Sequence, residues 1–186
     1  MQFTDLFEDV PIVAAVKSES ELEECLMCDS NVVFLLFGNI CNISELVRKI
    51  KDSGKLAMVH IDLVEGLASR EVGVDYIKEH TNADGIISTK SALVKHAKSL
   101  GLLTIRRFFL LDSMALESIS KSAGSCEADA FEVIPGVMPK IISLIVNECD
   151  KPIIAGGLIR DKEDVLNALS AGAIAVSSTN SKVWFM

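Results

Sequence analysis

Eight short apolar runs, separated by segments of helical character, recur along this chain of 186 residues. They lie at 11–17, 32–38, 56–62, 85–90, 103–110, 130–135, 152–157 and 173–179. Most are rich in Val, Ile and Phe with little alternation of apolar and polar residues, as is typical of parallel strands buried on both faces. Eight strand–helix units predict a compact α/β fold, a closed (β/α)8 barrel of the TIM-barrel type.

The alternative fold is an open, doubly wound sheet, which often carries a G-x-G-x-x-G turn after its first strand. No such turn follows the run at 11–17, and the regular spacing of the units favours the closed barrel. Val13 and Met58 are expected to fill the barrel interior. No linker or low-complexity segment interrupts the series, so residues 1–186 are expected to form one domain.

The segments between the runs carry helix start and stop signals. Ser18 and Glu21 stand at capping-box spacing, as do Asn42 and Glu45. Asp161 is expected to cap the helix that follows it. Glycines that suit the left-handed residue after a helix end several of these segments; they are Gly54, Gly101 and Gly172.

Charge and composition exclude several classes of protein. The formal net charge of −8 disfavours tight nonspecific binding to nucleic acid, which depends on a surplus of Lys and Arg. No apolar run reaches the ~18 residues of a membrane-spanning helix, and the N-terminus lacks a signal-peptide pattern, so we expect a soluble cytoplasmic protein.

Cys25 and Cys28 form a C-x-x-C without a second pair or a nearby His. We interpret them as structural thiols and expect neither a metal site nor a cofactor.

Polar residues gather where the predicted strands end, which is the side of such a barrel that binds ligands. They are Lys17, His60, Asp62, Lys90, Arg106, Arg107, Glu132, Gly156, Gly157, Ser178 and Thr179. Each has an ordinary structural alternative: lysines point to water, His60 belongs to the core, and Glu132 pairs with an arginine. Since the two arginines are adjacent, only one can face the barrel interior, and the other is expected to pair with a helix carboxylate. Taken together, so many charges at one end of the barrel indicate a ligand site.

The loops after the last two runs give the sharpest signal. Gly156 and Gly157 would let backbone N–H groups approach an anion, and Ser178 and Thr179 would add hydroxyl donors. The closing segment NSKVWFM would bring a short helix N-terminus to the same place. We interpret these loops as a phosphate site, the alternative being a glycine turn alone.

The remaining rim residues suit a small polyol phosphate. Lysine and arginine would neutralise the phosphate, while Asp62 and Glu132 would accept hydrogen bonds from hydroxyl groups. The short loops leave no room for a long lid, which counts against an enzyme. The alternative function is a small barrel enzyme acting on a triose or polyol phosphate, with Glu132, Asp62 or His60 as acid or base.

Several long segments also resemble a known family. They are VFLLFGNICNI (33–43), VHIDLVEGL (59–67), DGIISTK (84–90), GLLTIRRFFLLDS (101–113), EVIPGVMPKII (132–142), PIIAGGLIRDKEDV (152–165) and NSKVWFM (180–186). These are similar to the glycerol uptake operon antiterminator regulatory protein family. The resemblance implies a TIM-barrel-like protein without an established catalytic role, which responds to glycerol 3-phosphate and acts on the leader mRNA of glycerol-utilisation genes.

In that match the family's motif positions are occupied by Lys17, His60, Asp62, Lys90, Arg107, Glu132, Gly157 and Ser178. Arg106 stands where we expect a polar neutral residue, which leaves open whether Arg106 or Arg107 lines the site. The candidate RNA contact is a basic cluster of Arg48, Lys49, Lys51 and Lys55. Its alternative role is to offset the dipole at a helix C-terminus. No RNA-recognition signature accompanies the cluster, and a homo-oligomer is compatible with the sequence.

Overall fold

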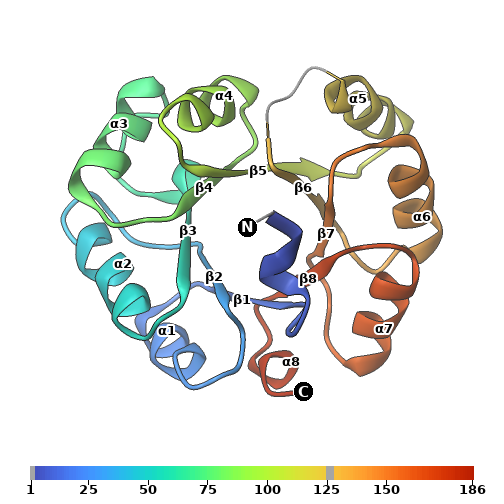
Figure 1. Ribbon diagram of the computed structural model, residues 1–186, viewed down its shortest axis with the longest axis horizontal. Helices are drawn as coiled ribbons and strands as arrows, with labels where there is room; N and C mark the ends of the chain where they lie inside the picture. The colour runs from blue at the N-terminus through green and yellow to red at the C-terminus, as the bar shows by residue number, and fades with distance from the viewer. Residues whose placement is uncertain (1–2, 125–127) are drawn as a thin grey trace.

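The computed structural model describes residues 3–124 and 128–186, whose eight parallel strands form a closed barrel (Figure 1). Each strand pairs with the next one along the chain, and β8 closes the barrel against β1. The strands are β1 Ile12–Val16, β2 Val32–Leu35, β3 Leu56–His60, β4 Gly85–Ser88, β5 Leu103–Phe109, β6 Ala130–Ile134, β7 Ile153–Gly156 and β8 Ala175–Ser178. Each lies within the apolar run that predicted it. The (β/α)8 barrel is therefore confirmed, and the open sheet is excluded.

Helices surround the barrel, one after each strand, in the part of the chain that the structure describes (Figure 1). They are α1 Glu19–Cys25, α2 Ile43–Asp52, α3 Glu71–His80, α4 Ser91–Ser99, α5 Ser113–Ala123, α6 Pro139–Glu148, α7 Lys162–Ser170 and α8 Ser181–Trp184. Two short 3-10 helices, η1 Phe3–Phe7 and η2 Ile61–Leu63, complete the described elements. None of these helices is long and apolar enough to cross a membrane.

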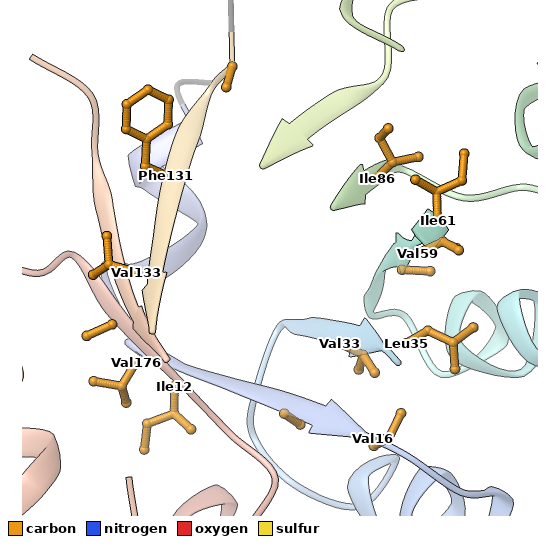
Figure 2. Packing of buried hydrophobic residues seen from close by; sticks show 14 of the residues in the cluster. Ile12, Val16, Val33, Leu35, Val59, Ile61, Ile86, Phe131, Val133 and Val176 are labelled. Atoms are coloured by element: carbon orange, nitrogen blue, oxygen red, sulfur yellow. The ribbon is translucent and has the colours of Figure 1, made fainter. Parts of the chain in front are cut away.

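Apolar side chains form two separate layers because successive residues of a strand point to opposite faces. Val13 and Met58 belong to the inner layer, which fills the barrel as predicted. Ile12 and Val16 belong to the outer layer, which lies between the strands and the helices. Figure 2 shows this outer layer, with the labelled strand side chains directed away from the barrel interior. The barrel is thus buried on both faces, as its continuous apolar runs require.

The N-terminal 3-10 helix η1 closes the end of the barrel at which the strands begin, here called the lower end. It lies across the barrel centre in Figure 1 and runs directly into β1, so it covers the amino-terminal ends of the strands. Phe7 is buried within the inner layer, and Phe3 and Leu6 pack against the same layer. The upper end, where the strands finish, carries the polar residues.

The predicted helix caps are confirmed at Ser18 and Asp161, whose side chains accept hydrogen bonds from Glu21 and Asp164 backbone N–H groups at 3.3 and 3.0 Å. The prediction at Asn42 was wrong in its mechanism. Its carboxamide oxygen instead accepts from the backbone N–H of Asn39 at 2.8 Å, which folds the preceding loop. The predicted terminal glycines, Gly54, Gly101 and Gly172, all have positive φ angles.

Two aspartates bind neighbouring strands together at the lower end of the barrel. Asp84, just before β4, accepts hydrogen bonds from the backbone N–H of Ala57 in β3 at 2.8 Å and from the Lys51 ammonium at 2.6 Å. Asp129, just before β6, accepts from the backbone N–H of Thr104 in β5 at 2.9 Å and from a lysine of α4. Each carboxylate therefore joins a helix to two adjacent strands.

We predict that Asp129→Ala lowers the free energy of unfolding by about 2 kcal/mol, because charge-assisted hydrogen bonds to a strand N–H and a lysine are lost. Urea unfolding followed by circular dichroism measures the change. Asp52→Ala is the matched control: its carboxylate is 66% exposed, and its partner among the described residues is Arg48 at 3.4 Å. That change should cost less than about 0.5 kcal/mol. Equal losses in the two variants would contradict a structural role for Asp129.

Candidate functional site

A cavity of about 530 Å³ opens at the upper end of the barrel, over the carboxyl ends of β5 to β8 and of the adjoining β1 and β2. Five of the residues proposed from the sequence line it: Arg107, Glu132, Gly157, Ser178 and Thr179. The loops after β7 and β8 contribute half of the remaining wall, from Leu158 to Arg160 and at Asn180. The cavity thus lies at the loops that the sequence indicated, and no residue of β3 or β4 lines it.

A hydrogen-bonded group of Arg107, Glu132 and Ser177, here called the floor triad, forms the base of the cavity. Arg107 Nε donates to Glu132 Oε2 at 2.5 Å, and Ser177 Oγ donates to Glu132 Oε1 at 2.6 Å. The side chains of Arg107 and Glu132 are only 8% and 1% exposed. A charge buried this deeply needs a partner, and the ion pair and the hydroxyl offset the cost of burying the Glu132 carboxylate.

The floor triad also explains Gly156, which the sequence assigned to the phosphate. A Cβ atom at this position would lie 2.5 Å from both Glu132 Oε1 and Ser177 Oγ, which is too close for either contact to survive. Gly156 is buried in β7 and is not part of the cavity wall. Its missing side chain therefore makes room for the floor triad, and its role toward a phosphate stays a prediction.

The loop after β7 is held in an unusual backbone conformation. Gly157 has φ of 74° and Leu158 has φ of 63°, a left-handed value that bulky residues rarely adopt. Leu158 is 60% exposed, so packing of its side chain does not explain the conformation. Within the described residues, no acceptor binds the backbone N–H groups of Gly157, Leu158 and Ile159. Strained backbone with free donors beside a cavity is typical of a ligand site.

The loop after β8 is hydrogen-bonded to the loop after β7. Ser178 Oγ donates to the carbonyl of Ile159 at 2.8 Å and accepts from the backbone N–H of Asn180 at 3.1 Å. Asn180 Nδ2 donates to the Arg160 carbonyl at 2.9 Å. The predicted hydroxyl donor at Ser178 is therefore already committed to the protein. Thr179 is exposed, and its backbone N–H has no acceptor in the described part of the chain.

Three of the proposed residues do not line this cavity. The ammonium of Lys17 lies 3.9 Å from Glu21, and that of Lys90 donates to Ser69 Oγ. Asp62 accepts hydrogen bonds from Ser88 Oγ at 3.0 Å and from Thr89 through both its backbone N–H and its hydroxyl. Asp62 thus joins the end of β3 to the end of β4.

His60 lies inside the barrel beneath the rim and does not line the cavity either. It is 3% exposed, and its Nδ1 atom has no hydrogen-bond partner in the described residues. Burial, with the nearby positive charge of Arg107, lowers the pKa of His60 to about 4, while Asp62 opposes the shift from 4.0 Å away. His60 is therefore neutral at physiological pH.

Arg107 is the arginine that faces the interior, and Arg106 points to the outside of the barrel. Arg106 donates to Ser122 Oγ at 2.8 Å, and its guanidinium lies 4.6 Å from the centre of the Phe108 ring. The expected helix carboxylate was therefore wrong: a helix hydroxyl and an aromatic face take its place. The guanidinium stacks well on such a face because the ring carries partial negative charge there.

The basic cluster proposed for RNA does not form one free surface. Lys55 is buried and donates to the carbonyl oxygens of Cys28 and Ser30 at 2.5 and 2.9 Å. Lys51 is bound to Asp84 at the lower end of the barrel. Arg48 and Lys49 remain at the surface of α2, in exposed pairs with Asp52 and Glu45 at 3.4 and 4.0 Å. Such pairs contribute little and open easily.

The sequence interpretation missed Ser177, Leu158 and Arg160 as wall residues. Ser177 was detectable, because it shares the inward parity of Ala175 on β8. Arg160 gave a weaker signal, since its position depends on the strained turn at Leu158. Its side chain is exposed and makes no ion pair with any described residue.

Cys25 and Cys28 behave as structural thiols. Both are buried, and Cys28 Sγ donates to the Cys25 carbonyl at 3.0 Å. Burial raises the pKa of the Cys25 thiol to about 12, so it stays protonated and unreactive near neutral pH. Among the described residues, no group of His, Cys, Asp and Glu is arranged to hold a metal ion.

We predict that His60 makes the protein less stable as the pH falls. Its pKa is about 4 when folded and about 6.5 when unfolded, so the unfolded chain takes up a proton first. Its contribution to the free energy of unfolding should fall by about 3 kcal/mol between those two pH values and stay constant above them. Urea unfolding of the native protein and of His60→Gln across this range tests the prediction. If the free energy of unfolding depends on pH in the same way in the native protein and in His60→Gln, His60 is not held neutral in the folded state.

The comparisons with known proteins agree with this architecture and with the resemblance found in the sequence. The model of the family described as "Glycerol-3-phosphate responsive antiterminator" matches residues 12–184. The uncharacterized protein YgcP of Escherichia coli is 41% identical over 184 residues, which cover 99% of this chain and 96% of that protein.

Two solved structures are similar over nearly their whole length. The glycerol uptake operon antiterminator regulatory protein of Listeria monocytogenes has a TM-score of 0.91 and 30% identity, with 96% of each chain covered. A glycerol uptake operon antiterminator-related protein of Thermotoga maritima has a TM-score of 0.81 and 32% identity, covering 94% of this chain and 98% of that one. This chain therefore belongs to the glycerol-3-phosphate responsive antiterminator family.

Proposed function

We propose that this protein binds glycerol 3-phosphate in the cavity above the floor triad and then acts on the leader mRNA of glycerol-utilisation genes to prevent early termination of transcription. The observation that carries the ligand part is a group of unused donors at one wall. It comprises the backbone N–H groups of Gly157, Leu158, Ile159 and Thr179 together with the guanidinium of Arg160. A phosphate is the ligand that such a group binds best, because its oxygens accept several hydrogen bonds and carry charge.

The chemistry of the cavity supports binding over catalysis. Glu132, the carboxylate in the wall, accepts hydrogen bonds on both oxygens from Arg107 and Ser177. Asp62 is held by the residues at the end of β4, and His60 lies below the cavity. None of these groups is placed as a free acid or base facing a ligand, so the enzyme alternative has no observation in its favour.

We predict that Arg160→Gln weakens the binding of glycerol 3-phosphate at least about 10-fold, because a guanidinium–phosphate contact is lost without a change in the barrel core. Isothermal titration calorimetry measures the affinity. Lys162→Gln is the matched control: it removes the same charge from an exposed position on α7, outside the cavity. If both variants bind like the native protein, the phosphate does not lie at the β7 loop. If no phosphate ester binds the native protein, the effector proposal fails.

The RNA part of the proposal draws on the family to which the chain belongs, since the net charge of −8 gives no general affinity for RNA. Arg48 and Lys49 are the members of the predicted cluster that remain accessible, and we retain them as the candidate contact. Because these residues offer few contacts to RNA phosphates, recognition would depend on the folded structure of the RNA and on whether glycerol 3-phosphate is bound to the protein.

We predict that glycerol 3-phosphate increases readthrough of a leader terminator in a purified transcription assay and strengthens binding of the protein to the same leader RNA. A leader whose terminator stem has been removed serves as the control template. Arg48→Gln combined with Lys49→Gln should weaken RNA binding about 10-fold while leaving ligand affinity unchanged. Readthrough that is the same with and without ligand would reject the regulator proposal. Unchanged RNA binding in the double variant would place the RNA on another surface.

A further inference from the structure

The two arginines that line the cavity differ in their charge environment. Arg107 is neutralised by Glu132, whose carboxylate oxygen lies 2.5 Å from Nε in a buried setting. Arg160 makes no ion pair with a described residue and lies at the exposed rim. The cavity therefore has a neutral base and a positively charged edge. An anionic group gains most from the edge, where its charge is not already matched.

The floor triad still has unused hydrogen-bonding capacity. Arg107 donates through Nε alone, and its terminal nitrogens bind no acceptor in the described residues. A guanidinium has further N–H donors, and a carboxylate that accepts one hydrogen bond per oxygen keeps lone pairs for others. Donors and acceptors thus lie side by side at the base of the cavity, without a net charge between them. This combination matches hydroxyl groups, each of which both donates and accepts.

Resting on the function proposed above, we infer that the ester binds in one orientation, with its phosphate at the loops after β7 and β8 and its uncharged, hydroxyl-bearing end on the floor triad. Glu132 is then a specificity-determining residue, because its charge excludes a ligand with a second anionic group at that end.

The physical reason lies in the balance of charges at the base. A carboxylate placed there would lose its hydration and meet an arginine whose charge Glu132 already cancels. It would also lie close to the Glu132 carboxylate, and like charges in a buried site repel strongly. A hydroxymethyl group suffers neither penalty. Selection against the wrong ligand by an unfavourable contact is a common source of specificity.

Two matched ligands test the inference. Glycerol 3-phosphate and 3-phosphoglycerate share the phosphate, the chain length and the central hydroxyl, and differ in a hydroxymethyl group against a carboxylate. Calorimetry on the native protein should show glycerol 3-phosphate binding at least about 100-fold more tightly. Inorganic phosphate, which can occupy only the edge, should bind more weakly than glycerol 3-phosphate. Equal affinity for the two esters would overturn the inference and leave the effector proposal standing.

Glu132→Gln provides the second arm. Glutamine has almost the same shape but no charge, so Arg107 is left with its positive charge uncancelled. The variant should bind 3-phosphoglycerate more tightly and glycerol 3-phosphate more weakly than the native protein. The ratio of the two affinities, glycerol 3-phosphate over 3-phosphoglycerate, should therefore fall at least about 30-fold. Glu163→Gln, at an exposed position on α7, makes the same change in net charge and should keep the native ratio.

The outcomes separate the two proposals. A native ratio in Glu132→Gln would show that another residue excludes the second anion. If Glu132→Gln does not fold, the native comparison of the two esters decides the inference by itself. If the native protein binds no phosphate ester, the effector proposal fails and this inference falls with it.

Discussion

The alternation of side chains along a closed parallel barrel is the constraint on which the rest of this structure depends. Every strand residue must face either the packed interior or the helices, and a shift by one residue exchanges the two faces. This parity places Arg107 inside and Arg106 outside, although they are neighbours in the chain. It also places Ser177 on the floor triad and turns Ser178 toward the adjoining loop. Strand register therefore decides which side chains form the base of the cavity, and the loops decide only the shape of its wall.

The fold could be predicted from the sequence because its signals are local and repeated. Each strand lies within an apolar run, and the caps at Ser18 and Asp161 stand directly before the helical segments that they cap. Asn42 also stood at capping-box spacing, but its side chain accepts a hydrogen bond from Asn39 in the preceding loop instead of capping the helix. The contacts of Ser178 with Ile159, and of Gly156 with Glu132 and Ser177, join parts of the chain that are distant in sequence, and a single sequence does not reveal them.

The place of the cavity could be predicted from the sequence, but most of its lining could not. The glycines at the end of β7 predicted a ligand site at this end of the barrel, and a cavity lies there. The strained turn at Leu158 had no signal in the sequence, because a left-handed leucine is an exception to residue preference, and the position of Arg160 depends on that turn. Conversely, Lys17, Asp62 and Lys90 have the charges of ligand residues, but their contacts are with Glu21, Ser88 and Ser69 of the protein itself. Charge at a strand end therefore does not by itself identify a residue of the cavity wall.

The seal formed by η1 has a consequence for how quickly a bound molecule can exchange. Phe7 is buried among the inner side chains at the lower end, so the described residues leave no second passage to the solvent there. A molecule held above the floor triad must enter and leave at the upper end, where the loops after β7 and β8 form part of the cavity wall. Any macromolecule that rests on this upper face would then lengthen the residence time of the ligand beneath it. The rate of ligand exchange would then depend on complex formation, even if the barrel itself does not move.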